Sequence, residues 1–141
     1  MTAYLFHADA IAEALRSEPR EAYLAWLRTL PREAQFTSAL SMAELYRGAD
    51  ASSDPQRHIR AIEERVLPAV TVLPFDVAVA RRLGQLEAAL PDPAVLSRVD
   101  LLVAATALYH GLEIVTVKSG SFRRIPDLSV RPLPRRRRRR G

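Results

Sequence analysis

The stretch that decides the fold is residues 99–121, V-D-L-L-V-A-A-T-A-L-Y-H-G-L-E-I-V-T-V-K-S-G-S. Its first half carries apolar residues at helical spacing, and Ser97 and Gly111 supply the expected N-cap and C-terminal stop. Residues 112–116, L-E-I-V-T, follow directly and have the short, β-branched pattern of a core strand. A helix that leads into a strand through one glycine is half of a parallel α/β unit. Asp100 is the one acid at the start of this otherwise apolar helix, so it is the first candidate for chemistry.

The rest of the chain alternates short strands with helices in the same way. We expect further strands at residues 2–6, 35–39, 70–73 and 128–130. We expect helices that start after Asp9, at residues 17–19 (ending at Pro31), at Ser41 (ending at Gly48), after Asp54 and after Asp76. Strands joined through helices imply a short, mostly parallel sheet, so the predicted fold class is α/β with three layers, α/β/α. Ligands of such sheets bind at the carboxyl ends of the strands.

Composition is that of an ordinary soluble domain. The 141 residues are 48% hydrophobic and 26% charged, which suits one domain with a proper core. Cysteine is absent, so the sequence offers neither disulfides nor thiolate metal sites. The N-terminal residues lack the pattern of a signal peptide, and no apolar run approaches the ~20 residues of a membrane span. We therefore expect a cytoplasmic protein without a membrane partner.

The basic charge is concentrated at the C-terminus. The net charge is +5, but six arginines form one run at residues 135–140, and without them 15 basic residues face 16 acidic ones. We predict one domain over residues 1–133 and a basic, disordered tail over residues 134–141. Such a tail either neutralises nucleic-acid phosphates or is a solvated end without a role in the fold. The second interpretation is favoured, because no aromatic residue for base stacking lies within the run.

Three carboxylates follow strands or start helices: Asp9, Glu44 and Asp100. Each has a simple structural explanation, because Asp9 suits an N-cap and both Ser41-x-x-Glu44 and Ser97-x-x-Asp100 have capping-box spacing. If the three instead converge on one sheet edge, they repel one another unless a cation lies between them. Oxygen ligands of this kind favour Mg²⁺ or Mn²⁺.

Five stretches, in order along the chain, resemble a known family. They are Y-L-F-H-A-D-A-I-A-E-A-L (4–15), S-M-A-E-L-Y-R-G (41–48), V-L-P-F-D (72–76), D-L-L-V-A-A-T-A-L-Y-H-G-L-E-I-V-T (100–116) and F-R-R-I-P-D-L (122–128). In this pattern the chain resembles a PIN-domain ribonuclease of the VapC toxin type. The resemblance implies a PIN-like fold and a metal-dependent RNA endonuclease, usually a homodimer, that a small antitoxin protein neutralises.

The resemblance also assigns the site. Glu44 and Asp100 stand where the family keeps its second and third acids, and Asp9 stands two residues after the position of the first acid. It therefore implies that Asp9, Glu44 and Asp100 are catalytic and hold Mg²⁺ or Mn²⁺. His7 is a further candidate ligand, since a neutral imidazole also binds Mn²⁺.

The sequence departs from the family pattern inside this site. His7 occupies the position of the first acid, Lys118 stands where the family usually has Asn, and Ser121 stands where many members have a fourth acid. These changes remove negative charge and add a positive one, so a two-metal arrangement would be short of anionic ligands. A single substitution introduced to silence a toxic nuclease would account for His7, but not for Lys118 and Ser121 as well.

Two functions follow as expectations. The first is a metal-dependent endoribonuclease, the toxin of a toxin–antitoxin pair, in which Arg123, Arg124 or the arginine tail holds the RNA phosphates. The alternative is a catalytically weakened PIN-like module that binds an antitoxin or RNA without cleavage, as the changes at His7, Lys118 and Ser121 indicate.

Overall fold

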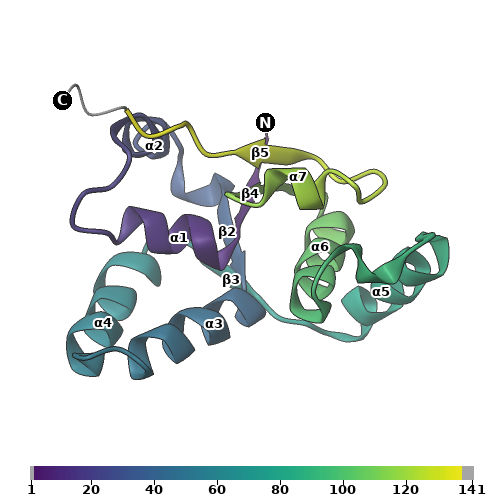
Figure 1. Cartoon of the computed structure of the whole chain (residues 1–141), viewed down its shortest axis with the longest axis horizontal. Helices are drawn as coiled ribbons and strands as arrows, with labels where there is room; N and C mark the ends of the chain where they lie inside the picture. Colours follow the sequence, from purple (N-terminus) through teal and green to yellow (C-terminus); the bar gives the residue numbers. More distant parts are fainter. Residues whose placement is uncertain (1, 138–141) are drawn as a thin grey trace.

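Five parallel strands form the centre of the fold, with helices on both faces (Figure 1). The computed structural model describes residues 2–137. The strands are β1 (Tyr4–Phe6), β2 (Gln35–Ser38), β3 (Thr71–Leu73), β4 (Glu113–Thr116) and β5 (Val130–Pro132), in the spatial order β3-β2-β1-β4-β5. All four strand pairs are parallel, so the predicted three-layer α/β class is confirmed, with a sheet that is wholly rather than mostly parallel in the described residues.

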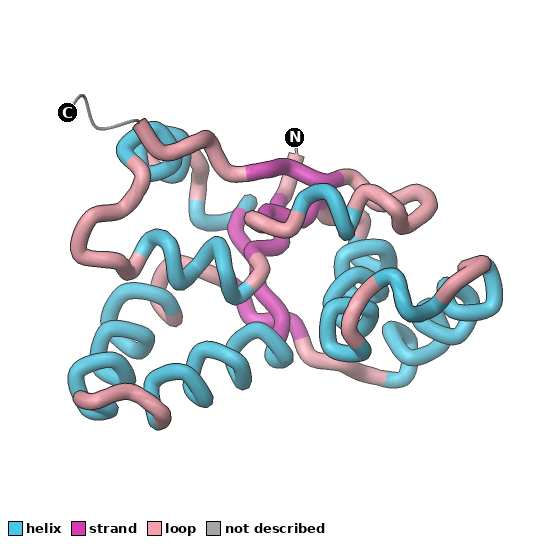
Figure 2. The backbone as a smooth tube through the Cα atoms, in the orientation of Figure 1, coloured by secondary structure: helices cyan, strands magenta, loops and turns pink. Residues whose placement is uncertain are grey.

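The helices divide into two groups on opposite sides of the sheet. They are α1 (Ala8–Ala14), α2 (Glu21–Leu27), α3 (Ala39–Asp50), α4 (Pro55–Ala61), α5 (Val77–Ala89), α6 (Arg98–His110) and α7 (Ser119–Phe122), with a π-helical turn at Ile62–Val66 and 3₁₀ turns at Arg32–Ala34 and Pro93–Val95. Figures 1 and 2 show α1, α3 and α4 on one side of the strands and α5 and α6 on the other. No helix in residues 2–137 is long and apolar enough to span a bilayer.

Alternate residues of β1 serve two separate cores. Leu5 is fully buried against α5 and α6, whereas Tyr4 and Phe6 pack with α1, α2 and α3 on the opposite face. This is the period-two alternation of a strand that is buried on both faces. β4 repeats the arrangement, with Ile114 on the α5–α6 side and Val115 on the other.

The stretch at residues 97–116 forms as predicted. Ser97 caps α6, because its hydroxyl accepts a hydrogen bond from the Asp100 N–H at 3.1 Å. Gly111 ends the helix in the left-handed region with φ 67°, where an L side chain is strained. β4 starts two residues later. Local signals were sufficient here because cap, stop and apolar face are all short-range features.

Three predicted helix starts are wrong. His7, not Asp9, caps α1, and its Nδ1 lies 3.1 Å from the Asp9 N–H. Ser38, not Ser41, caps α3, so β2 runs directly into the helix, which continues through Gly48 to Asp50. The second helix, α2, begins at Glu21 and ends at Leu27, inside the expected limits of residues 17–31.

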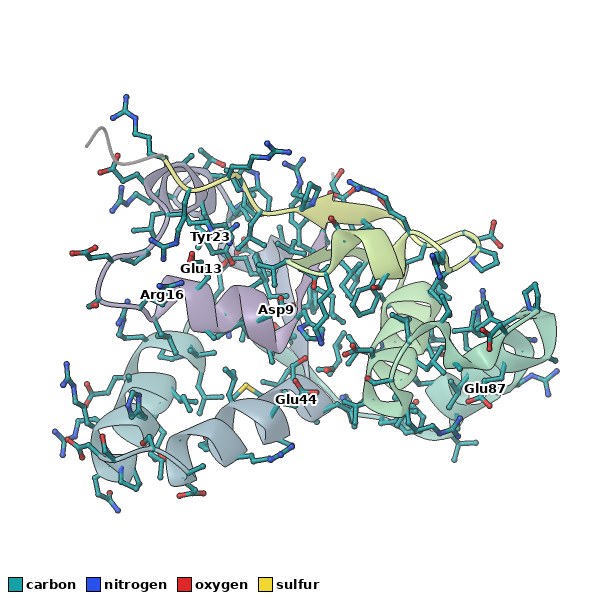
Figure 3. The ribbon with its side chains drawn as sticks, in the orientation of Figure 1. Asp9, Glu13, Arg16, Tyr23, Glu44 and Glu87 are labelled. Atoms are coloured by element: carbon teal, nitrogen blue, oxygen red, sulfur yellow. The ribbon has the colours of Figure 1, made fainter. Side chains whose placement is uncertain are left out.

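The first residues of the predicted tail contact the domain. Arg136 donates a hydrogen bond to Oε1 of the buried Glu13 at 3.2 Å, and to the Glu18 carbonyl at 3.0 Å. Arg20 donates to the Pro134 carbonyl and its Nε lies 2.8 Å from Glu13 Oε1. Figure 3 shows Glu13 and Asp9 on the same helix, α1. Residues 138–141 lie outside the described residues, so the boundary at 133/134 and the disorder of the tail stay predictions.

Candidate functional site

The site forms where the strand order reverses. From β1 the chain moves to β2 and β3 on one side, and β4 and β5 lie on the other, so β1 and β4 are neighbours at the reversal. This is the point at which parallel sheets bind ligands, beyond the carboxyl ends of the strands. His7 follows β1, Lys118 follows β4 by two residues, and Asp100 lies in the first turn of α6. The fold therefore brings residues 93 positions apart into contact.

Asp100 is held between two nitrogen groups. Its Oδ1 lies 2.8 Å from His7 Nε2, and its Oδ2 accepts a hydrogen bond from Lys118 Nζ at 3.1 Å. His7 is only 2% exposed and the Asp100 side chain 6%, whereas the Lys118 side chain is 50% exposed. The imidazole ring also packs edge-on against Phe122, with ring centroids 5.6 Å apart. The pair His7–Asp100 is thus a buried polar contact, and Lys118 covers it from the solvent side.

Asp9 is fixed by the residues that follow β4. The hydroxyl of Thr116 donates to Asp9 Oδ2 at 2.9 Å, and the backbone N–H of Val117 donates to Oδ1 at 3.2 Å. The Lys118 N–H in turn donates to the Thr116 hydroxyl oxygen at 3.0 Å. Thr116 was not predicted as a site residue, because the pairing of the β1 end with the β4 end is visible only in the folded sheet.

His7 carries a positive charge at neutral pH. Burial alone lowers the pKa of His7, but the hydrogen bonds to Asp100 and Asp9 and their negative charges outweigh it and raise the pKa from 6.5 to about 9. Nδ1 faces both the Asp9 N–H and, at 3.2 Å, the Asp9 carboxylate. A neutral ring would accept from the N–H. The protonated ring donates to the carboxylate instead, and two flanking anions favour this second form.

The same contacts keep both carboxylates ionised. Burial raises the pKa of Asp9 and of Asp100, but the hydrogen bonds and charge of His7 exceed this effect and bring both values below the ordinary range. Thr116 and Val117 add to the lowering at Asp9, and Lys118 adds to it at Asp100. Two anions and two cations therefore alternate through the site.

Glu44 lines the same pocket from α3. A cavity of about 690 Å³ is bounded by residues of α1, α3, α4 and the end of β4, including His7, Asp9, Glu44 and Lys118. Figure 3 shows Asp9 and Glu44 projecting from two adjacent helices. Glu44 is half-buried and lies six residues after its N-cap, Ser38, so the capping-box explanation does not hold for it. A smaller apolar cavity of about 270 Å³ between α1 and α2 holds none of the predicted site residues.

The arrangement does not fit a divalent ion. Each of the four carboxylate oxygens of Asp9 and Asp100 already has a donor within 3.2 Å, from His7, Thr116, Val117 or Lys118. In residues 2–137, no three His, Cys, Asp or Glu side chains form a group that could hold a metal. The cations that offset the carboxylates belong to the chain itself.

The remaining predicted residues lie apart from this pocket. Ser121 is exposed on α7, and Arg123 and Arg124 are exposed just after it; none of the three is among the described residues that line the cavity. Three arginines that were not predicted do line it: Arg16, Arg57 and Arg65. A sequence signal for them was lacking, because exposed arginines on amphipathic helices are common.

Sequence comparison places the chain among curated toxins. A family model described as PIN domain matches residues 5–128. The chain is 34% identical over 125 residues to Toxin FitB of Neisseria gonorrhoeae, an alignment that covers 84% of this chain and 89% of that protein. It is also 34% identical over 120 residues to VapC ribonuclease Y4jK of Sinorhizobium fredii, covering 81% and 86% of the two chains.

Solved structures agree in fold. The crystal structure of FitAcB from Neisseria gonorrhoeae matches with a TM-score of 0.80 at 31% identity, over 90% of this chain and 95% of that chain. VapBC2 from Rickettsia felis, bound to a DNA fragment from its promoter, matches with a TM-score of 0.85 at 21% identity, over 94% and 100% of the two chains. The second match supports the fold alone. With the matched family model spanning nearly the whole sheet and the site residues at its reversal point, this chain belongs to the PIN-domain family.

Proposed function

We propose that this chain is a PIN-type ribonuclease toxin of the VapC class, which cleaves RNA phosphodiesters at the pocket that holds Asp9, Glu44 and Asp100. The observation that carries the proposal is the convergence of these acids, from three separate elements, at the reversal point of the sheet. The relatives named VapC ribonuclease and tRNA(fMet)-specific endonuclease support the reaction class.

The geometry supports different roles for the three acids. Asp9 and Glu44 line the cavity, so they are the carboxylates that can contact the phosphate and the attacking water. Asp100 is buried and contacts His7 and Lys118, which makes it a positioning residue for those two cations. Lys118 is the group that can neutralise charge developing on a phosphate oxygen, because its ammonium is half-exposed at the pocket.

The metal requirement is a separate question. PIN-domain nucleases of the VapC type are in general dependent on divalent metals, and the sequence predicts Mg²⁺ or Mn²⁺ at Asp9, Glu44 and Asp100. These residues do not fit an ion while His7 and Lys118 occupy Asp100. We therefore assign no step to a metal, and the cleavage assay below includes Mg²⁺, Mn²⁺ and EDTA.

His7 favours one second candidate, a module that binds RNA or an antitoxin without cleavage. The imidazole stands where the family keeps its first acid, and it ties Asp9 to Asp100 in a buried contact. A site in which the acids are already neutralised has less negative charge available for activating water. This candidate predicts RNA binding with no product.

The test is cleavage of a labelled RNA under single-turnover conditions. The proposal expects fragments that disappear with Asp9→Asn and with Glu44→Gln, while Glu87→Gln, a change on the opposite side of the sheet, leaves them unchanged. Fragments that persist in all three variants would be due to a contaminating nuclease and would refute the assignment. Binding without fragments in every metal condition would support the second candidate.

The proposed partners follow from the relatives. The FitAcB and VapBC structures are toxin–antitoxin complexes, and we extend to this chain a cognate antitoxin, a homodimeric state and, because RNA is the substrate, a cytoplasmic location. Light scattering of the purified chain, alone and co-expressed with the neighbouring reading frame, measures both assemblies. A monomer that co-purifies with no small partner would contradict this part of the proposal.

A further inference from the structure

The pocket at the sheet reversal carries more positive than negative charge. Among the described residues, its lining includes the carboxylates Asp9 and Glu44, and it includes Arg16, Arg57, Arg65 and Lys118 on the basic side. Asp100, the third carboxylate, is turned away from the cavity into its contacts with His7 and Lys118. A pocket of this charge attracts an anion directly, whereas a pocket of unneutralised acids would need a cation first.

Lys118 is placed to bind that anion. Its ammonium has three N–H donors, and the contact with Asp100 Oδ2 at 3.1 Å uses one of them. Half of the side chain is exposed, so the other donors point where solvent or a phosphate oxygen can reach them. The ion pair with Asp100 also restricts the side chain, which lowers the entropy cost of binding.

The arginines surround the cavity from three further directions. Arg16 follows α1, Arg57 lies on α4, and Arg65 lies in the π-helical turn. The Arg65 guanidinium donates to the Ala14 carbonyl at 3.2 Å, and Arg16 lies 3.6 Å from Glu13, so both are anchored to α1 at one edge. Guanidinium groups spaced along one groove suit successive phosphates of a single strand.

We propose that this pocket binds the RNA phosphate backbone without a divalent ion, with Lys118 occupying the role of the cation at the carboxylates and with Arg57 and Arg65 holding flanking phosphates. The inference rests on the proposed function for the identity of the ligand, and it goes beyond it in assigning binding to the chain's own cations. A free carboxylate cluster would give the opposite behaviour, binding only after an ion is added.

The test is fluorescence anisotropy of the full chain with a short labelled single-stranded RNA, in EDTA and in Mg²⁺. We expect binding in EDTA, a loss of about fivefold or more with Lys118→Met, and recovery with Lys118→Arg. Arg57→Gln is expected to weaken binding and to reduce the salt slope by about one, as the loss of one phosphate contact requires. Arg81→Gln, an exposed change on α5, is the matched control and is expected to change affinity less than about twofold.

A second readout does not depend on mutation. Lys118 is the only lysine in the sequence, so reductive ¹³C-methylation, which keeps the charge, labels this side chain and the N-terminal amine alone. Inorganic phosphate or RNA is expected to shift the Lys118 methyl signal in EDTA and to leave the amine signal in place.

The outcomes separate the inference from the proposed function. RNA binding only in Mg²⁺, or binding in EDTA that Lys118→Met and Arg57→Gln leave intact, would overturn the inference while leaving a ribonuclease possible. Absence of RNA binding in both conditions would refute the proposed function as well. Circular dichroism of each variant ensures that a lost affinity is not a lost fold.

Discussion

Replacing His7 with Asp restores the carboxylate that the family pattern has at this position, and it should make the domain depend on a cation. The imidazole is 2% exposed and lies within 3.2 Å of both Asp9 and Asp100. Its pKa, raised from 6.5 to about 9 by the two carboxylates, corresponds to about 3 kcal/mol of folding free energy at neutral pH. His7→Asp removes this contribution.

The new carboxylate also repels its neighbours. A pair of unit charges about 5 Å apart costs about 3 kcal/mol at an effective dielectric constant of about 20. Protonation of one carboxyl group relieves most of this repulsion, so the loss of the His7 contribution sets the expected size. We therefore expect His7→Asp to lower the free energy of unfolding by about 3 kcal/mol in EDTA.

Added Mg²⁺ is expected to return part of this stability to the variant. An ion that binds only the folded state contributes about 1.4 kcal/mol at ten times its Kd. The wild-type chain, whose carboxylates already contact His7 and Lys118, is expected to gain much less from the same concentration. The difference between the two chains isolates the effect of the site.

Urea denaturation followed by circular dichroism, in EDTA and in Mg²⁺, measures these values. His58→Asp is the matched control, because His58 lines the same pocket but is exposed, and it is expected to change stability by less than about 0.5 kcal/mol. A His7→Asp chain as stable as the wild type in EDTA, or one that Mg²⁺ does not stabilise, would refute the reasoning.

Three further predictions concern stability. Since the folded-state pKa of His7 exceeds its ordinary value, its contribution is complete below about pH 6.5 and is lost as the pH rises through 9, which urea midpoints at pH 6 and pH 9.5 will measure. Glu13→Gln should cost roughly 1–2 kcal/mol, because it leaves partly buried guanidiniums without a carboxylate, while exposed Glu33→Gln changes little by the same thermal melt. Gly111→Ala should destabilise by about 1 kcal/mol owing to its φ of 67°, whereas Gly84→Ala within α5 should stabilise by about 0.5–1 kcal/mol; equal shifts in denaturation midpoint would contradict this.

Short-range patterns were enough for most of the secondary structure. The helix at Arg98–His110 and the strand after it could be predicted because apolar spacing, a serine cap and a stop at Gly111 all act within a few residues. The α1 and α3 starts were wrong for a related reason. His7 and Ser38 end strands, so their capping role depends on where the sheet releases the chain rather than on the residues around them.

The acids of the site were predictable in kind but not in environment. Their order along the chain and the family resemblance identified Asp9, Glu44 and Asp100, and the sequence also marked His7 and Lys118 as departures. Sequence could not show that His7 bridges Asp9 and Asp100, that Thr116 holds Asp9, or that Arg57 and Arg65 face the same cavity.

The reason is that local structure and site chemistry depend on different distances along the chain. Capping and amphipathic faces arise within one or two helical turns, so residue order alone specifies them. The charge state of His7 depends on Asp100, 93 residues away, and on the parallel pairing of β1 with β4 that places them 2.8 Å apart. Only the assembled sheet determines whether these carboxylates meet a metal ion or the chain's own imidazole and ammonium groups.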